Sequence, residues 1–316
     1  MSLSLVGDIG GTNARFGLWQ DGQLSAVQVL STAAFATPEQ AVLQYLSGRN
    51  LLPGNIASVC LAVAGPVSGD QFRFTNNHWE LSRSSFCASL KIERLLLVND
   101  FTAMALGMTH LKPDQLIQIR PGKAEAGAPA VVIGPGTGLG VSTLQPLADG
   151  RWMVLPGEGG HVDLPIANTS EAELWLKLQA LLGHVRAEDV LSGAGLVNLY
   201  NAVCAVGGVE PELKTPAAVT SVALSGNSLA EQALEQFCIW LGRVAGNNVL
   251  TVGGRGGVYL VGGVVPRFAE FFQHSGFNRA FAEKGCMSRY FADIPVWLVT
   301  AEYPGLEGAG VALEQL

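Results

Sequence analysis

Residues 6–19 read VGDIGGTNARFGLW, an apolar run that ends in an acid, two glycines and a returning apolar run. This pattern predicts two strands joined by a glycine loop. Residues 132–144, VIGPGTGLGVSTL, repeat the same order of strand, loop with glycine and threonine, and returning strand. The repetition indicates a diverged internal duplication, in which each half of the chain builds its own sheet.

The segments around the two loops predict a chain of α/β class in two domains. In the first half, strands are expected at residues 3–9, 14–19, 24–30, 58–64 and 95–98, with helices near 38–47, 83–90 and 101–108. In the second half, strands are expected at 130–134, 140–144, 152–155, 257–261 and 294–300, and helices near 170–182, 195–204, 215–224, 228–250, 266–273, 277–283 and 306–316. Residues 112–129 read as a turn-rich connection. The duplication places a small domain at 1–110 plus 300–316 and a large one at 111–299.

Composition excludes several classes of partner. The 316 residues, 48% of them hydrophobic, suffice for two cores. A net charge of -7 and a pI near 5.3 give no overall attraction to the phosphates of nucleic acids or of anionic lipids. No apolar run approaches the ~18 residues of a membrane span, and the N-terminal apolar stretch ends at Asp8. We therefore expect a soluble, unprocessed cytoplasmic protein that binds neither nucleic acid nor membrane.

Cysteine spacing argues against structural disulfides and zinc. The five cysteines lie far apart without a CxxC pair, which suits neither a disulfide framework nor a four-thiolate site. A reducing compartment fits them.

The first glycine loop has the side chains that a metal-bound triphosphate requires. Neither GxxxxGK[ST] nor a GxGxxG that follows a strand occurs, so a nucleotide would have to be bound by a different phosphate-binding loop. Asp8 ends a buried strand, Gly10 and Gly11 offer backbone amides, and Thr12 and Asn13 follow as donors. Because Mg²⁺ prefers oxygen ligands and keeps waters, Asp8 would hold it directly or through water. A tight turn with a capping aspartate remains the alternative.

Two further glycine loops complete a candidate nucleotide site. The second loop has no charged side chain and would bind phosphates through backbone amides and one hydroxyl; its candidate residues are Gly134, Gly136, Thr137 and Gly138. Gly262 and Gly263 end another buried strand before Pro266, where an adenine could lie on exposed backbone. For both loops, an ordinary turn stays an open alternative.

Asn99 and Asp100 end a buried strand with adjacent polar side chains. Phosphoryl transfer needs a group that accepts the proton of the attacking hydroxyl, and Asp100 fits that role. The alternative is that Asp100 only caps the helix expected to begin at Phe101.

Glu158 and His161 lie in the glycine-rich segment LPGEGGH, at residues 155–161. Together they can accept from and donate to neighbouring hydroxyls of a sugar ring. A metal site at His161 would need more ligands, and Asp163 is the one additional candidate close in the sequence.

Dispersed motifs make a family resemblance specific. The order of the three glycine loops resembles that of the actin-like ATPase superfamily, which includes hexokinase. More narrowly, the chain resembles the bacterial glucokinase family, through LVND at 97–100, LPGEGGH at 155–161, GHVRAEDVLSG at 183–193 and LVGGVVPRF at 260–268. The resemblance covers the chain from Leu5 to Leu316.

The resemblance implies a duplicated, ribonuclease H-like two-domain fold with the active site in the interdomain cleft. It implies ATP and Mg²⁺ as cofactors, glucose 6-phosphate as product, Asp100 as general base and a cytoplasmic homodimer. Glu188 corresponds to the third acid that this family places on the sugar, and Asn76 lies in a loop that only partly matches the family's sugar-side loop.

Two other functions remain open. A kinase of mannose, fructose or an N-acetylated hexosamine would keep the same motifs. A non-catalytic sugar sensor on the same fold normally carries a DNA-binding helix-turn-helix before the first loop and loses the base, whereas seven residues precede Asp8 here and Asp100 is present.

Overall fold

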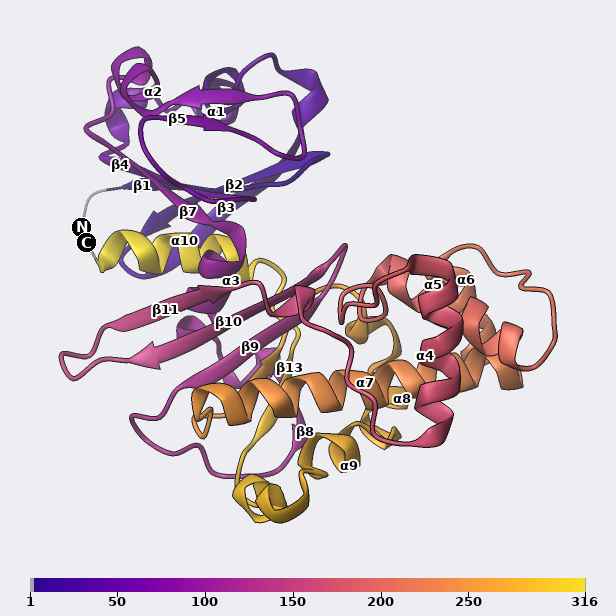
Figure 1. Cartoon of the computed structure of the whole chain (residues 1–316). Coiled ribbons are helices and arrows are strands. Elements are labelled where there is room, and N and C mark those ends of the chain that lie inside the picture. The colour runs from indigo at the N-terminus through magenta and orange to yellow at the C-terminus, as the bar shows by residue number, and fades with distance from the viewer. Residues whose placement is uncertain (1–2, 316) are drawn as a thin grey trace. The chain divides into compact units, whose positions relative to one another are not determined.

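The structure is a computed structural model that describes residues 3–315 (Figure 1). It divides into two compact units. Unit 1 contains the chain up to Lys112 and from Ala301 onward, and unit 2 contains Pro113–Thr300.

Unit 1 contains a five-stranded sheet whose parallel strands end at one edge. Its strands are β1 (Ser4–Ile9), β2 (Asn13–Gln20), β3 (Gln23–Ser31), β4 (Ser58–Val63) and β7 (Arg94–Asn99), in the order β3-β2-β1-β4-β7. β2 is antiparallel to β1 and β3, while β1, β4 and β7 run parallel. Strands β1 and β4 are almost wholly buried, which explains their continuous apolar sequence.

Unit 2 repeats this topology in a six-stranded sheet. Its strands are β8 (Leu116–Arg120), β9 (Ala130–Pro135), β10 (Leu139–Pro146), β11 (Trp152–Gly157), β12 (Val258–Leu260) and β13 (Val296–Val299), in the order β11-β10-β9-β12-β13-β8. β9 pairs antiparallel with β10 and parallel with β12, as β1 does with β2 and β4. The repeated order confirms the duplication, and β8 is an additional edge strand.

Helices complete both units. Unit 1 has α1 (Pro38–Ser47), α2 (Arg83–Leu90), α3 (Asp100–Gly107) and α10 (Pro304–Glu314). Unit 2 has α4 (Thr169–Leu182), α5 (Gly193–Val206), α6 (Pro216–Leu224), α7 (Ser228–Val252), α8 (Ala269–His274) and α9 (Phe277–Ala282). Short 3₁₀ helices are η1 (Thr32–Ala34), η2 (Pro53–Asn55), η3 (Met108–His110), η4 (Pro113–Gln115), η5 (Gly159–His161), η6 (Val265–Phe268) and η7 (Gly285–Phe291). In the described chain, none of these helices has the length and apolarity to cross a membrane.

The last helix of the chain packs on elements of the first segment. α10, yellow in Figure 1, lies against α3, β1 and β4. Gly308 permits this approach, because a Cβ there would overlap the carbonyl group of Ala103. Trp19 contacts the same helix and donates from Nε1 to Glu314 Oε1 at 2.9 Å.

Helix α7 organises the core of unit 2. It packs against α5, α6, α9 and β9, and buries Phe237, Trp240 and Leu241. One ion pair is buried among these helices: Arg243 Nε donates to Glu171 Oε1 at 2.9 Å, with side chains 8% and 1% exposed. Such a pair is expected to fix α4 against α7, since removal of one partner would leave a buried charge.

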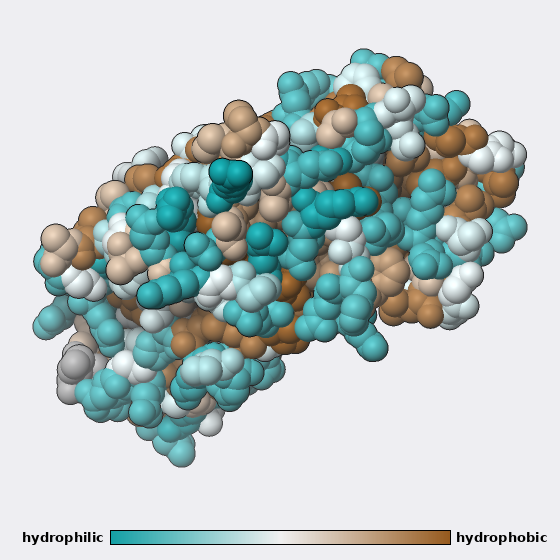
Figure 2. Space-filling view, turned by 90° about the horizontal axis from the view of Figure 1, so that it is seen from below, coloured by the Kyte–Doolittle hydropathy of each residue, from teal (hydrophilic) through white to brown (hydrophobic). Residues whose placement is uncertain are grey.

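Most of the visible face in Figure 2 is hydrophilic, with hydrophobic residues between polar ones. All five cysteines are free thiols, of which Cys60, Cys204 and Cys238 are buried and Cys286 is exposed.

The structure differs from the expected elements in three places. Residues 112–129 contain η4 and strand β8, which the turn-rich composition concealed. A short hairpin, β5 (Gln71–Arg73) with β6 (Glu80–Ser82), was not expected. The expected helix at 266–273 is divided into η6 and α8, because Phe268 leaves the helical region at φ -139° and ψ 37°.

Candidate active site

Asp8 and Asp100 belong to the same edge of the unit 1 sheet. The register aligns Ile9 with Val63 and Val63 with Asn99, so the parallel strands end together. Proximity to Asp100 contributes to the raised pKa of Asp8. Asp8 on β1 and Asp100 after β7 are separated by β4 in the sheet. Both lie at the edge where the strands have their carboxyl ends, which is where ligands of α/β sheets bind.

The electrostatics of Asp8 favour a cation. Burial is the main cause that raises the pKa of Asp8 above its usual 3.8, and the negative charge of Asp100 adds to it. Arg15 opposes the shift, since its Nη1 donates to Asp8 Oδ2 at 3.3 Å. A divalent ion would stabilise the carboxylate further. The donor set fits Mg²⁺, which is commonly held by one or two carboxylates with waters and substrate phosphates.

The loop after Asp8 is held by hydrogen bonds from unit 1. Gly10 N–H donates to the carbonyl of Asn13 at 2.9 Å, and the carbonyl of Gly10 accepts from Asn77 Nδ2 at 3.1 Å. The Gly11 carbonyl accepts from the Thr32 hydroxyl at 2.8 Å, and the Thr12 carbonyl accepts from the Thr32 amide at 3.0 Å. The loop is therefore held in one conformation, with Thr12 exposed at its tip.

Asn76 borders this loop. Its side chain is exposed, and its backbone oxygen would lie 2.8 Å from a Cβ at Gly11, so only glycine fits there without a shift. Trp79, three residues later, is fully buried in the unit 1 core and is not a ligand contact.

Asn99, and not Asp100, caps helix α3. Asn99 Oδ1 accepts from the amides of Phe101 and Thr102, each at 3.0 Å. Asp100 is the first residue of the helix and is exposed, with Oδ1 also accepting from the Phe101 amide at 2.8 Å. The N-cap alternative for Asp100 is therefore wrong.

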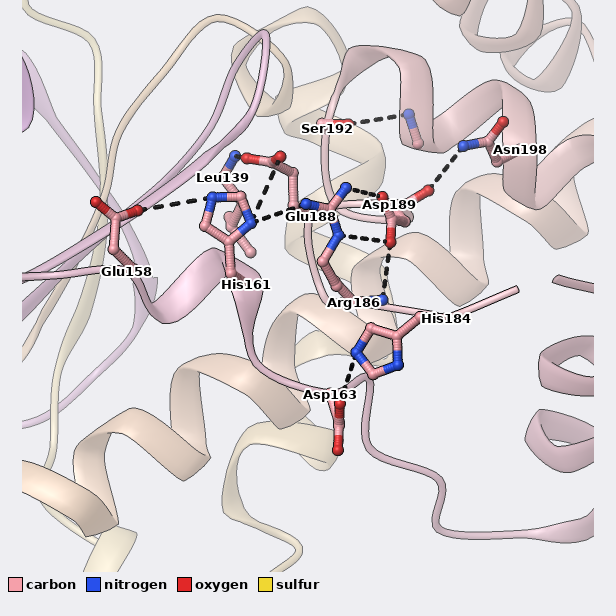
Figure 3. Close-up of polar contacts among 11 residues, drawn as sticks. Leu139, Glu158, His161, Asp163, His184, Arg186, Glu188, Asp189, Ser192 and Asn198 are labelled. Atoms are coloured by element: carbon pink, nitrogen blue, oxygen red, sulfur yellow. Dashed lines mark hydrogen bonds and ion pairs between the residues drawn. The ribbon is translucent and has the colours of Figure 1, made fainter. Parts of the chain in front are cut away.

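Backbone pairing assembles the candidate sugar-binding residues of unit 2 (Figure 3). The segment after Glu158 pairs with the segment before Asp189: Ala187 N–H donates to Val162 O and Glu188 N–H to Gly160 O, both at 2.8 Å. Gly160 is required by close approach to β10, because a Cβ there would overlap the Leu139 carbonyl. Residues far apart in the sequence thereby become neighbours.

Glu158, His161 and Glu188 lie together in this part of unit 2. His161 Nε2 is 3.7 Å from Glu158 Oε2, and His161 Nδ1 is 4.0 Å from Glu188 Oε1. Glu188 Oε2 accepts from the Leu139 amide at 2.9 Å, which links the acid to the second glycine loop. The side chains are 88%, 45% and 26% exposed in the order Glu158, His161, Glu188, so all three are accessible to a ligand. Two carboxylates that accept hydrogen bonds, beside an imidazole that can accept or donate, suit a ring with several hydroxyl groups.

The second and third glycine loops border one pocket in unit 2. Its volume is about 380 Å³, and it is lined by Gly136, Thr137, Gly193, Leu196, Pro216, Thr220, Gly263, Val264 and Arg267. The Val264 amide donates to the Pro135 carbonyl at 3.3 Å, which ties the two loops together. Gly262 has φ +90°, and a Cβ there would overlap that carbonyl. The pocket is large enough for a nucleoside, and α5 begins beside it, where phosphates are favoured.

Several neighbouring residues were missed by sequence reasoning. Arg15 pairs with Asp8 from the adjacent strand, and Arg186 contacts both His161 and Asp189. The spacing of Arg186 and Asp189 resembles any surface pair three residues apart, so the sequence offered little signal. Pro216, Thr220 and Arg267 line the pocket between the second and third glycine loops, from elements whose sequence shows only helical periodicity.

No group of three metal-ligating histidine, cysteine or acidic side chains occurs among residues 3–315. His184 Nε2 lies 3.1 Å from Asp163 Oδ1, and these side chains form an exposed pair. A magnesium ion at Asp8 would therefore take its remaining ligands from phosphates and water.

Comparisons with known proteins extend over the whole chain. A family model described as glucokinase matches residues 5–316. A glucokinase of Pseudomonas aeruginosa is 54% identical over 314 residues, which cover 99% of this chain and 95% of that protein. The crystal structure of a glucokinase from an Antarctic psychrotroph has a TM-score of 0.93 and 35% identity, with both chains covered completely.

A more distant structure shares the fold. The glucokinase of Balamuthia mandrillaris, solved in complex with glucose, has a TM-score of 0.79 and 24% identity, covering 99% of this chain and 94% of that one. The two-sheet, two-unit α/β architecture is thus that of sugar kinases. With a family model spanning nearly every residue and a relative more than half identical, the chain belongs to the glucokinase family.

Proposed function

We propose that this chain transfers the γ-phosphoryl group of ATP to the 6-hydroxyl of glucose, with Asp100 as general base, and releases glucose 6-phosphate and ADP. The observation that carries the proposal is the position of Asp100: it begins α3 beside Asp8, is exposed, and leaves helix capping to Asn99. As a member of its family, the chain is an enzyme, a glucokinase that uses ATP.

Glucose is the proposed acceptor. Glu158, His161 and Glu188 would bind its hydroxyls, and their proximity in unit 2 supports this. Asn99 would contact the sugar through Nδ2, because its Oδ1 caps α3. Asn76 is a further proposed contact, at the rim of the first glycine loop.

ATP would be held by the three glycine loops. The proposed residues are Asp8, Gly10, Gly11, Thr12, Asn13, Gly134, Gly136, Thr137, Gly138, Gly262 and Gly263. The shared pocket of Thr137 and Gly263 would receive the nucleoside. Magnesium near Asp8 would, when bound, neutralise charge on the phosphates.

The proton of the attacking hydroxyl would pass to a carboxylate oxygen of Asp100 as that hydroxyl attacks phosphorus. Positioning contributes as much as proton transfer, because phosphoryl transfer asks little covalent chemistry of the protein. The helix terminus and the cap at Asn99 would keep the Asp100 carboxylate oriented.

We further propose that the two units are the domains expected at 1–110 plus 300–316 and at 111–299, that the active site forms in the cleft between them, and that the protein is a cytoplasmic homodimer. The family supports these proposals.

An ADP-release assay with Mg·ATP and a panel of hexoses tests acceptor and activity together. We expect kcat/KM for glucose to exceed that for mannose, fructose and N-acetylglucosamine. Sites that hydrogen-bond a hydroxyl can discriminate by roughly 10⁴ against analogues that lack it. Equal turnover of all hexoses would contradict the glucose assignment, and no ADP release with any of them would contradict kinase activity.

A further inference from the structure

A second layer of polar contacts lies behind the proposed sugar-binding residues (Figure 3). Arg186 stands between His161 and Asp189 and contacts both. We propose that Arg186 is a positioning residue for glucose binding. Arg186 would hold His161 in the tautomer that carries its proton on Nε2. This inference rests on the proposed function, since it concerns the hydrogen bonds that the site offers a sugar.

Asp189 fixes the guanidinium group in place. Arg186 Nε donates to Asp189 Oδ2 at 3.0 Å, and Nη2 donates to Oδ1 at 2.6 Å, a two-point contact that sets the plane of the group. The Arg186 amide also donates to Oδ2 at 2.8 Å, and Asn198 Nδ2 donates to the Asp189 carbonyl at 3.0 Å. The hydrogen bond with Arg186 lowers the pKa of Asp189 and raises that of Arg186, so both stay charged near neutral pH.

The remaining guanidinium nitrogen determines the tautomer of His161. Arg186 Nη1 lies 3.0 Å from His161 Nδ1. Arginine can only donate, and a neutral imidazole has one donor and one acceptor nitrogen. His161 Nδ1 must therefore accept, which leaves the proton on Nε2. A hydrogen bond to one ring nitrogen commonly selects the tautomer in this way.

This tautomer places a hydrogen-bond donor, Nε2–H of His161, beside a hydrogen-bond acceptor, the carboxylate of Glu158. His161 Nε2 is 3.7 Å from Glu158 Oε2, longer than a hydrogen bond. A hydroxyl between them would accept from Nε2–H and donate to the carboxylate, so both of its hydrogen-bonding roles would be used. With the opposite tautomer, that hydroxyl would face two acceptors and lose one hydrogen bond.

Nitrogen NMR on the full-length protein without ligands tests the tautomer directly. The His161 ring signals are assigned by their loss in His161→Gln. In the wild type we expect a protonated Nε2 and an unprotonated Nδ1. In Arg186→Met, which removes the donors at similar length, the signals should shift toward a mixture of tautomers. The ring of His274, whose Nδ1 contacts the Glu270 carbonyl on α8, should not change. A wild-type His161 protonated on Nδ1, or unchanged signals in Arg186→Met, would overturn the proposal.

Kinetics test the consequence for the sugar. Arg186→Met should raise KM for glucose by roughly tenfold or more, the loss expected for one well-oriented hydrogen bond to a charged or oriented group, while KM for ATP changes little. Arg186→Lys, which keeps one donor, should recover part of the loss. Arg151→Met is the matched control, because Arg151 makes a similar contact with Asp149 at 2.8 Å in an exposed turn.

The outcomes separate this inference from the proposed function. An equal rise in both KM values, or no recovery with lysine in a variant of normal circular dichroism, contradicts positioning by Arg186. If Arg186→Met fails to fold, the wild-type NMR signals and Arg186→Lys still decide. Failure of the wild type to phosphorylate glucose would contradict the proposed function, and the NMR result would still report the tautomer.

Discussion

Asp100 is exposed, as a reactive group must be, and it is the first residue of helix α3, where acids often have a structural role. Because Asn99 supplies the cap of α3, the carboxylate of Asp100 is not needed to begin the helix. Its charge also acts on Asp8, the acid that ends β1. A substitution of Asp100 is therefore expected to lower the rate of catalysis while the protein still folds.

The first prediction is that Asp100→Asn lowers kcat by at least ~10²-fold and leaves ATP binding nearly unchanged. Asparagine keeps the shape of aspartate but cannot take a proton, and general-base catalysis contributes ~10²–10⁴-fold. Steady-state kinetics, calorimetric ATP binding and thermal melting check it. Glu39→Gln, which removes a first-turn acid from α1, is the control and should retain full kcat. Near-normal kcat in Asp100→Asn would refute the base assignment.

The second prediction concerns the pH dependence of stability at Asp8. Since burial and Asp100 raise its pKa, the folded protein binds the proton more tightly than the unfolded chain. The wild type therefore loses free energy of unfolding as pH rises from the usual value of 3.8 through the raised pKa, and Asp8→Asn lacks this loss.

Urea unfolding across this pH range, without nucleotide, measures the difference. The variant should gain stability relative to the wild type as pH rises, and the gain should level off above the raised pKa. Activity with Mg·ATP should fall in the same variant. A variant that instead loses stability relative to the wild type as pH rises would show that the Arg15 contact outweighs burial. A difference that does not change with pH would also contradict the raised pKa of Asp8.

The sequence pointed to those proposed site residues whose own side chains or glycine backbones would carry the chemistry. Asp8, Asp100, Glu158 and His161 were recognisable because acids and imidazoles follow buried strands or stand among glycines. Arg186 was not, because it would act through His161, and its distance from that residue in the sequence hides the contact.

At the scale of elements, the crossing of α3 and α10 depends on glycine. A Cβ at Gly308 would overlap the Ala103 carbonyl, and one at Gly107 would overlap the Pro304 carbonyl. The two helices approach closely enough that backbone meets backbone. This contact joins the C-terminal helix to unit 1.

The third prediction is that Gly308→Ala destabilises the protein, although alanine favours helices. Overpacking typically costs about 1–3 kcal/mol, which exceeds the ~1 kcal/mol that alanine gains over glycine in a helix. The midpoint of urea unfolding should fall. Gly54→Ala is the matched control, since a Cβ there meets nothing within 4 Å, and its midpoint should stay near that of the wild type. Equal midpoints for both variants would rule out a tight crossing.

Elements with a clear local pattern were predictable, including the short strands β12 and β13, whereas β8 and the β5–β6 hairpin were not. Helix α7 shows a helical period over 25 residues, and the buried strands β1, β4 and β9 are apolar runs bounded by glycine or polar residues. Strand β8 has five residues and depends on pairing with β13, which is distant in the sequence. The β5–β6 hairpin has three residues in each strand, and the packing of Phe72 and Phe74 supports it. No local pattern specifies contacts of this kind.

At the scale of the whole molecule, duplication was the most informative sequence feature. Two loops of similar pattern predicted two sheets, and the sheets share the same strand order apart from β8. The sequence around the loops has diverged, so that the first carries Asp8 and the second carries only backbone groups and Thr137. One architecture thus supplies a charged and an uncharged glycine loop, both proposed to bind phosphate.

The return of α10 to unit 1 has a consequence for synthesis of the chain. The ribosome produces β1 and α3 first, then all of unit 2, and α10 only after unit 2. The face of unit 1 that includes Trp19 and Ala103 therefore has no covering helix until unit 2 has been synthesised. All of unit 2 is synthesised before α10 is available to cover that face. Chaperones that bind exposed apolar surface have their longest opportunity at this face of the nascent chain.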